Sequence, residues 1–207
     1  MDVVCLDLEG VLVPEIWTEF AENTGVEELK ATTRDVPAYD ELMQHRLSLL
    51  DKHDLKLTNI QRVIEEMEPL PGAKNFLDEL RKSYQLIILS DTFYEFAKPL
   101  MQKLDWPTLF CHRLKVSAEG QVVGYTLRQA DAKRKSVQSL KQLNFRVYAA
   151  GDSYNDTTML READAGFLFR APDNIVAEFP QFPVCTEYDE LRSSIDTAAV
   201  DLETRDL

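Results

Sequence analysis

The sequence predicts an α/β fold, with a Rossmann-like, mostly parallel sheet core and a small helical cap inserted after the first strand. Three apolar runs have the length of buried strands: residues 3–6, 86–89 and 145–150. Helical patterns separate these runs, and alternating strands and helices are typical of a parallel sheet covered on both faces. Only helical patterns lie between the first two runs. We therefore expect a core domain over residues 1–13 and 71–207 and a helical cap domain over residues 14–70.

The expected cap begins with a helix after the first strand. Pro14 suits the first position of that helix, and Gly25 suits its end. Residues 39–50 place apolar side chains mostly at helical spacing, and residues 58–61 resemble a capping box at the start of another helix. Pro71 and Gly72 then open a helix that leads into the second strand.

Beyond the second strand the alternation of helix and strand becomes regular. We expect helices over about 94–104, 131–143 and 156–163, a hairpin joining 114–116 to 122–125, and short strands at 166–169 and 183–185. Residues 196–207 have the composition of a partly loose acidic tail.

Composition narrows the class of protein. With 207 residues, 44% of them apolar, the chain can bury one large core. Its net charge of -13 disfavours nucleic acid and anionic membranes as partners. No signal peptide or membrane span is predicted, and three widely spaced cysteines favour buried, reduced thiols in a cytoplasmic protein. The three histidines are scattered, which favours solvated or structural roles.

Carboxylates follow two of the predicted strands where each strand ends. Asp7 and Glu9 come after the first strand, and Asp152 and Asp156 come after the strand at 145–150. The carboxyl ends of parallel strands meet at one edge of a sheet, so these acids should converge and repel one another. A divalent cation would relieve that repulsion, and oxygen-only ligands favour magnesium over zinc. A magnesium site of this kind suits phosphoryl transfer.

A hydroxyl and an ammonium complete the pattern. Ser90 ends the second strand, and Lys133 lies on the helix between the two acidic motifs. Alone, Ser90 would be an ordinary strand-end cap and Lys133 an exposed helix lysine. Their order and placement between the acidic motifs favour contacts with a phosphoryl group, where an ammonium screens the repulsion between phosphate and an attacking carboxylate.

These residues resemble a known family. Asp-x-Glu at 7–9, Ser90, Lys133 and Gly-Asp-x-x-Asn-Asp at 151–156 are similar to the motifs of the haloacid dehalogenase superfamily, and the expected insertion falls where that superfamily carries a cap. Within the superfamily, three further residues resemble phosphoserine phosphatases: Glu15, Arg46 and Phe93.

Two departures refine the resemblance. Phosphoserine phosphatases normally show Asp-x-Asp-x-Thr and Ser-Gly-Gly, where this chain has Asp-Leu-Glu-Gly-Val at 7–11 and Ser-Asp-Thr at 90–92. Both departures resemble the bifunctional branch of the family, phosphoserine phosphatase/phosphoserine:homoserine phosphotransferase. The two glycines are absent here, and the Asp91 side chain could replace, as a substrate contact, any contact that the family makes through glycine backbone.

The resemblance implies a role for each site residue. Asp7 would be the nucleophile and Glu9 the general acid and base. Magnesium would be held by Asp7, the backbone carbonyl of Glu9, Asp152 and, through a water, Asp156. The substrate contacts would be Ser90, Lys133 and Asn155 on the phosphoryl group and Glu15 and Arg46 on the amino and carboxylate groups. Alone, Arg46 would read as a solvated helix residue and Glu15 as a first-turn acid facing the helix dipole.

The function implied is a Mg²⁺-dependent phosphoserine phosphatase that works through an aspartyl-phosphate and also transfers the phosphoryl group to homoserine, as in serine and threonine biosynthesis. The alternative is a phosphatase of this superfamily acting on another small phosphorylated metabolite, which should not need the Glu15 and Arg46 pair. The sequence leaves open the ratio of hydrolysis to transfer, the preferred acceptor, any substrate contact by Arg128, and the oligomeric state, a homodimer included.

Overall fold

One seven-stranded sheet organises the part of the chain that the structure, a computed structural model, describes: residues 1–32, 36 and 39–205. The strand order is β4-β3-β2-β1-β5-β6-β7, and all neighbours are parallel except β3 and β4. The strands are β1 (Asp2–Leu6), β2 (Gln85–Phe93), β3 (Thr108–Val116), β4 (Val122–Thr126), β5 (Arg146–Gly151), β6 (Ala165–Phe169) and β7 (Val184–Cys185). The α/β fold with a mostly parallel sheet is confirmed.

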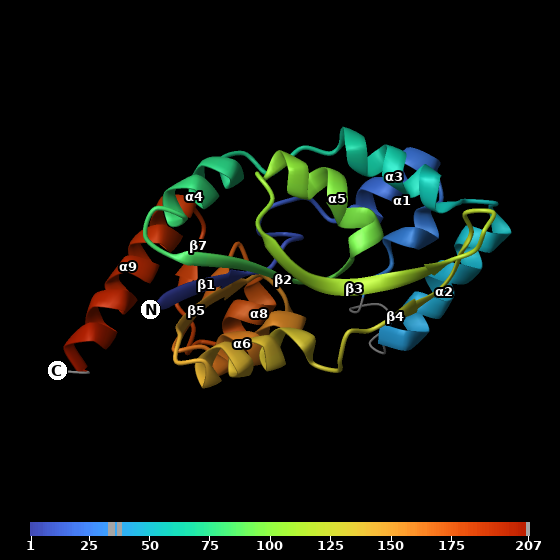
Figure 1. Cartoon of the computed structure of the whole chain (residues 1–207). Helices are drawn as coiled ribbons and strands as arrows, with labels where there is room; N and C mark the ends of the chain where they lie inside the picture. Colours follow the sequence, from blue (N-terminus) through green and yellow to red (C-terminus); the bar gives the residue numbers. More distant parts are fainter. Residues whose placement is uncertain (33–35, 37–38, 206–207) are drawn as a thin grey trace.

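Helices cover both faces of this sheet (Figure 1). They are α1 (Ile16–Thr24), α2 (Tyr39–Lys52), α3 (Leu57–Glu66), α4 (Ala73–Leu80), α5 (Tyr94–Lys103), α6 (Ala132–Gln142), α7 (Thr157–Glu162), α8 (Asp173–Glu178) and α9 (Tyr188–Arg205). Short 3₁₀ turns lie at Glu27–Lys30 and Tyr154–Asp156.

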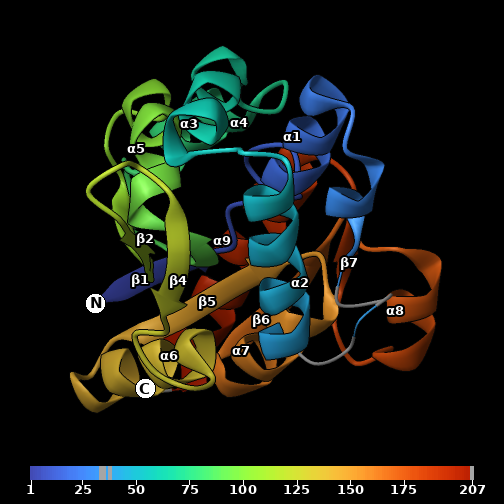
Figure 2. The ribbon, with the colours of Figure 1, turned by 90° about the vertical axis from the view of Figure 1, so that its right-hand side faces the viewer.

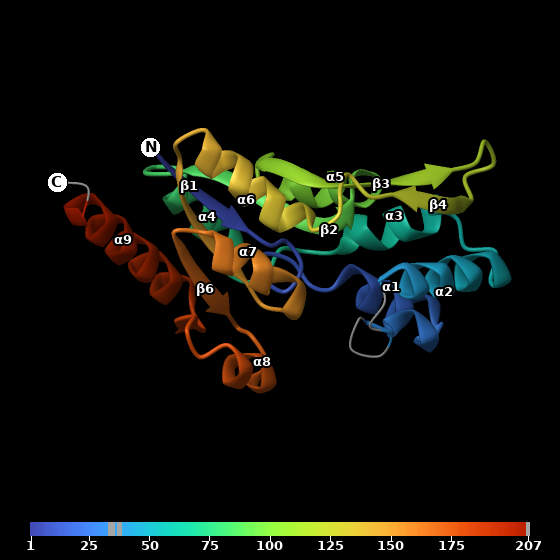
Figure 3. The same ribbon diagram turned by 90° about the horizontal axis from the view of Figure 1, so that it is seen from below.

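Strand β1 shows why the sheet needs a layer of helices on each of its faces. Its side chains alternate: Val4 and Leu6 belong to the apolar cluster under α4 and α9, whereas Val3 and Cys5 belong to the cluster under α6 and α7. All four side chains are buried. Figure 3 shows α6 and α7 along the sheet, with α9 at the end of the molecule where the N-terminus also lies.

Helices α1, α2 and α3 form the described part of the insertion. They lie on the side of the molecule toward which the β3–β4 hairpin extends (Figures 1 and 2), and α2 contacts β4. One apolar cluster contains Phe20 of α1 and Ile60 of α3 together with Leu6 of the sheet. The insertion therefore packs on the core, and the expected boundary between cap and core domains stays a prediction.

Strand β2 differs from the expectation that it ends at Leu89. It continues to Phe93, but its pairing with β3 shifts: Leu89 lies opposite Phe110, and Phe93 lies opposite His112. Between these two pairs the chain moves four residues along β2 but only two along β3, which makes a bulge in β2. Bulges redirect side chains at the end of a strand, and this one carries Ser90 and Asp91.

Two helix starts differ from expectation by a residue or two. Helix α1 begins at Ile16 rather than Pro14, and Gly25, with φ at 72°, ends it as expected. Helix α3 begins before the predicted cap: the side-chain oxygen of Asn59 accepts the Lys56 backbone N–H at 2.8 Å.

The expected loose tail is wrong for residues 196–205, and residues 206 and 207 lie outside the described residues. Residues 196–205 continue α9, which packs against α4 and β6. Its inner face buries Leu191 and Ile195, and the Tyr188 hydroxyl donates to the backbone carbonyl of Val11 at 2.7 Å. The missed signal is the helical spacing of these apolar side chains. The three cysteines are free and buried, and within the described residues no helix is both long and apolar enough to span a membrane.

Candidate active site

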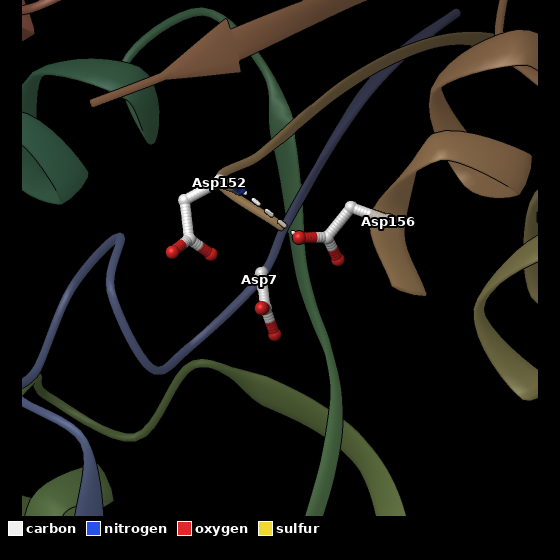
Figure 4. Close-up of side chains that lie close together, drawn as sticks. All are labelled: Asp7, Asp152 and Asp156. Carbon is white, nitrogen blue, oxygen red and sulfur yellow. Dashed lines mark hydrogen bonds between the residues drawn. The ribbon is translucent and has the colours of Figure 1, made fainter. Parts of the chain in front are cut away.

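Three aspartates meet at the carboxyl edge of the sheet. Asp7 directly follows β1 and is fixed by its backbone N–H, which donates to the Ala150 carbonyl at 3.0 Å. One carboxylate oxygen from each of Asp7, Asp152 and Asp156 lies within 4.8 Å of the others, and Figure 4 shows the three carboxylates converging. Gly10 makes room for this cluster, because a Cβ there would lie 2.4 Å from an oxygen of Asp152.

Lys133 of α6 neutralises part of this charge. Its Nζ lies 2.9 Å from Asp7 and 2.7 Å from Asp156, and its side chain is 4% exposed. The second oxygen of Asp156 accepts the backbone N–H groups of Asp152 and Ser153 at 3.0 and 3.1 Å. Asp156 is thus a fully buried carboxylate held by protein donors, behind the other two.

Burial and electrostatic repulsion raise the pKa values of Asp7 and Asp152. Burial, and then the charge of Asp156, raise the pKa of Asp152 to about 7. The same causes hold the pKa of Asp7 well above its usual range, although Lys133 opposes them. Burial disfavours the Lys133 ammonium, but Asp156 and Asp7 outweigh it and raise the lysine pKa. The cluster therefore carries more negative charge than one lysine can balance.

The donor set fits magnesium. It offers only oxygen atoms and an excess of carboxylates, which hard divalent cations prefer. The Glu9 carboxylate does not join the three aspartates in this cluster. It accepts the Ile16 backbone N–H at 2.9 Å, at the start of α1. Its expected metal contact runs through the backbone carbonyl and stays a prediction.

Glu9 has the environment of a proton donor. Burial, followed by repulsion from Glu15, raises the pKa of Glu9 to about 8. A carboxyl group with this pKa is largely protonated at neutral pH, as a general acid requires.

Arg46 of α2 lies beside the two glutamates and is 8% exposed. One guanidinium nitrogen donates to the Ala31 carbonyl at 2.9 Å, and the group lies over the Trp17 ring, 4.5 Å from its centroid. Its Nε has no hydrogen-bond partner among the described residues. Burial lowers the Arg46 pKa to about 10, so the side chain remains a cation.

The bulge in β2 supplies two more polar groups. Ser90 is buried, and its hydroxyl oxygen accepts the Thr92 N–H at 3.2 Å. Asp91 accepts the Asn155 side-chain amide at 2.8 Å and a ring N–H of His112 at 3.3 Å. No spacing along the chain indicated that His112 lies near the site, because it belongs to the neighbouring strand β3.

A cavity of about 350 Å³ connects these groups. Its walls include the expected residues Asp7, Glu9, Glu15, Arg46, Ser90, Asp91, Lys133, Asp152 and Asn155. Sequence reasoning missed Trp17 and Tyr39, which also line it. Arg128 does not line this cavity: it donates to the Ser136 hydroxyl at 2.8 Å and lies over the Phe110 ring.

Comparison with known proteins agrees with this geometry. Residues 1–164 match the haloacid dehalogenase-like hydrolase family. The phosphoserine phosphatase ThrH of Pseudomonas aeruginosa is 60% identical over 192 residues, which cover 93% of this chain and 94% of that protein. A phosphoserine phosphatase of Pseudomonas syringae pv. tomato is 59% identical over 199 residues, covering 96% of this chain and 84% of that protein.

The fold has solved counterparts. A crystal structure of a phosphoserine phosphatase in its apo form superposes with a TM-score of 0.76, covering 94% of this chain and 98% of that one. Its sequence is only 24% identical, so this match speaks for the fold alone. The family resemblance read from the motifs is confirmed by the first two matches, and the chain belongs to the haloacid dehalogenase-like hydrolases.

Proposed function

We propose that this protein is a magnesium-dependent phosphoserine phosphatase that works through an aspartyl-phosphate and also transfers the phosphoryl group to homoserine. One observation carries the proposal: a single cavity joins a phosphate-binding end, with Asp7 and Lys133, to an amino-acid-binding end, with Glu15 and Arg46. The names of the relatives from the two Pseudomonas species support the substrate.

Asp7 is the proposed nucleophile. A bond forms between its carboxylate oxygen and phosphorus while the bond from phosphorus to the seryl oxygen breaks. Two anions must approach each other in this step, and the Lys133 ammonium, 2.9 Å from Asp7, lowers the repulsion between them. Ser90 and Asn155, which both line the cavity, supply polar hydrogens to the phosphoryl oxygens.

Glu9 is the proposed general acid and base. With a pKa raised to about 8 by burial and by Glu15, it holds a proton at neutral pH and can give it to the departing seryl oxygen. The resulting carboxylate then takes a proton from the attacking acceptor, which is water in hydrolysis and the homoserine hydroxyl in transfer. The hydrogen bond that Glu9 accepts from the Ile16 N–H holds its side chain at the N-terminus of α1.

The amino-acid end binds the rest of the substrate. A guanidinium suits a carboxylate because it can donate two parallel hydrogen bonds, and Arg46 lines the cavity. Glu15 offers a carboxylate to the substrate ammonium. A phosphatase for metabolites without these two groups would have no use for the pair.

Asp7, Asp152 and Asp156 are the side chains that would hold magnesium, the last of them through a water. When bound, the ion would neutralise the carboxylates and the phosphoryl oxygens, so that Asp7 reacts as an anion. Asp156 also keeps Lys133 in place, independently of the ion, through its 2.7 Å contact.

The test incubates the enzyme with phosphoserine and magnesium, with and without homoserine, and measures inorganic phosphate and phosphohomoserine together. We expect phosphate without homoserine and both products with it. Phosphate alone in both reactions would reject the transferase activity and leave the phosphatase. Equal or faster hydrolysis of phosphate esters lacking an amino acid group would favour a phosphatase of another metabolite.

A further inference from the structure

Asp91 occupies the place where the sequence departs from the Ser-Gly-Gly pattern, and both of its carboxylate oxygens are engaged by the protein. One oxygen accepts the Asn155 amide at 2.8 Å and lies 3.8 Å from Lys133 Nζ. The other lies 3.3 Å from His112 Nε2. The carboxylate therefore has its hydrogen bonds within the protein, and it touches two residues that we assign to phosphoryl binding.

His112 is fixed on both sides. The backbone N–H of Arg128 donates to its Nδ1 at 3.1 Å, so this nitrogen is an acceptor and carries no proton. The ring proton then lies on Nε2, directed at Asp91. The imidazole is 3% exposed and does not line the cavity. With both nitrogens occupied and no access to substrate, His112 has no means to act as a base or a metal ligand.

The bulge in β2 explains why Asp91 needs the contact with His112. Residues in the bulge leave the regular ladder between β2 and β3, so regular pairing with β3 does not fix the backbone at Asp91. His112 lies on β3, opposite Phe93, and reaches back to Asp91 across the irregular part. The Tyr39 hydroxyl of α2 adds a 3.4 Å contact to the Asp91 backbone carbonyl.

We propose that His112 is a positioning residue: its neutral imidazole holds Asp91, and Asp91 orients the Asn155 amide and the Lys133 ammonium toward the substrate phosphoryl group. The inference rests on the proposed function, since it requires a phosphoryl ligand between these groups. It replaces the direct substrate contact expected for Asp91. A neutral donor suits this place, because it orients a carboxylate without cancelling the charge that faces Lys133.

Two substitutions at one position separate the contact with Asp91 from the contact with Arg128. In His112→Asn the side-chain amide can still accept the Arg128 N–H, but it is too short to reach Asp91. In His112→Gln the longer side chain can place its amide nitrogen near Asp91, but it leaves the Arg128 N–H without its partner. His45→Asn, at an exposed histidine of α2, is the matched control.

The readouts are the dissociation constant of inorganic phosphate, by calorimetry with magnesium present, and kcat and KM for phosphoserine. We expect His112→Asn to weaken phosphate binding by roughly 10–100-fold, the usual cost of losing an orienting partner. His112→Gln should lose much less binding even where its melting temperature falls as far or further. His45→Asn should match the wild type.

A purely structural role for His112 predicts the reverse pattern, with phosphate binding falling in step with melting temperature in both variants, and that result overturns the proposal. So does wild-type phosphate binding in His112→Asn. If neither variant folds, Asp91→Asn decides: it keeps the shape of the side chain but removes its charge, and unchanged phosphate binding would reject the arrangement. If the variants change the dissociation constant of inorganic phosphate as expected but the wild-type enzyme does not hydrolyse phosphoserine, the proposed function is rejected and the role of His112 is not.

Discussion

The two ends of the cavity are built differently. At the phosphoryl end, Lys133 and Asp156 bind each other at 2.7 Å, and backbone N–H groups occupy the second oxygen of Asp156. At the amino-acid end, Arg46 is almost as buried but keeps an Nε without a hydrogen-bond partner among the described residues. An unpaired buried donor costs free energy.

This difference between the two ends of the cavity indicates that the phosphoryl end carries out the reaction and the amino-acid end recognises the substrate. The phosphoryl end is anchored to strand ends and a bulge of the sheet, and its polar groups are held in place before substrate arrives. The amino-acid end lies on and beside α1 and α2, where one Arg46 nitrogen donates to the Ala31 carbonyl and Nε has no partner among the described residues. We therefore expect substitutions at the first end to reduce turnover and substitutions at the second end to reduce affinity.

The largest effect is expected at Asp7. Asp7→Asn removes the nucleophile but almost no volume, so turnover of phosphoserine should fall by at least about 10⁴-fold, as for other single members of a covalent catalytic unit. The fold should survive, since the substitution also removes a carboxylate that its neighbours repel. Phosphate release and circular dichroism measure the two outcomes. Retention of about a tenth of the activity, in protein free of deamidation, would reject the aspartyl-phosphate.

The next effect concerns the proton donor. Glu9→Gln keeps an oxygen that can accept the Ile16 N–H but cannot donate or accept the catalytic proton, so kcat should fall by roughly 10²–10⁴-fold with little change in KM. Glu9→Asp is the matched control, because it keeps the acid and should retain most hydrolysis. Equal losses in both variants would show that the position of the side chain, rather than its proton, limits the rate.

A smaller and more selective effect is expected at the other end. Arg46→Ala removes the proposed partner of the substrate carboxylate, and losing such a buried ionic contact costs about 2–5 kcal/mol. KM for phosphoserine should therefore rise by roughly 30-fold or more. Phosphoethanolamine, which has the amine but lacks the carboxylate, is the control substrate and should lose far less. Equal losses on both substrates would place Arg46 in the scaffold around Trp17 instead.

The sequence predicted the phosphoryl end better than its surroundings, for a physical reason. Asp7 and Asp152 each follow an apolar run, and parallel strands necessarily bring their carboxyl ends to one edge. Local spacing was therefore enough to place them. Glu15 and Arg46 were placed by family resemblance alone, because helix-to-helix packing leaves no spacing rule; the structure brings both to the cavity, and their roles stay predictions.

The position of His112 and the full length of α9 were not predicted, for different reasons. The contact of His112 with Asp91 depends on the register of β2 against β3 and on a bulge, and neither is encoded in spacing along the chain. Helix α9 was hidden by its acidic residues, although Leu191, Ile195 and Ala199 recur every four residues and are all buried. The periodicity should have outweighed the charge, because burial of an apolar stripe decides whether a surface helix forms.

The smallest expected effect is on stability, and it tests the repulsion among the carboxylates of the cavity. Without divalent cations, burial holds the pKa of Glu9 at about 8 against an ordinary 4.5, and that of Asp152 at about 7 against 3.8. Between the ordinary and raised values the folded protein binds more protons than the unfolded chain. Stability should therefore be greatest below about pH 4 from these groups and fall as pH rises through 7 and 8.

Magnesium should reverse this loss, because a ligand that binds only the folded state stabilises it, and the carboxylates bind best when deprotonated. The increase in melting temperature on adding magnesium should be larger at pH 8 than at pH 5.5. About 1 kcal/mol moves the melting temperature by roughly 2–4 °C in a chain of this size, so the difference is measurable by calorimetry. Glu9→Gln should flatten the pH dependence of the cation-free protein, whereas Glu119→Gln, at an exposed hairpin residue, should not. A cation-free melting temperature that rises from pH 5.5 to 8 would show that the acids of the cavity do not repel one another as the geometry requires.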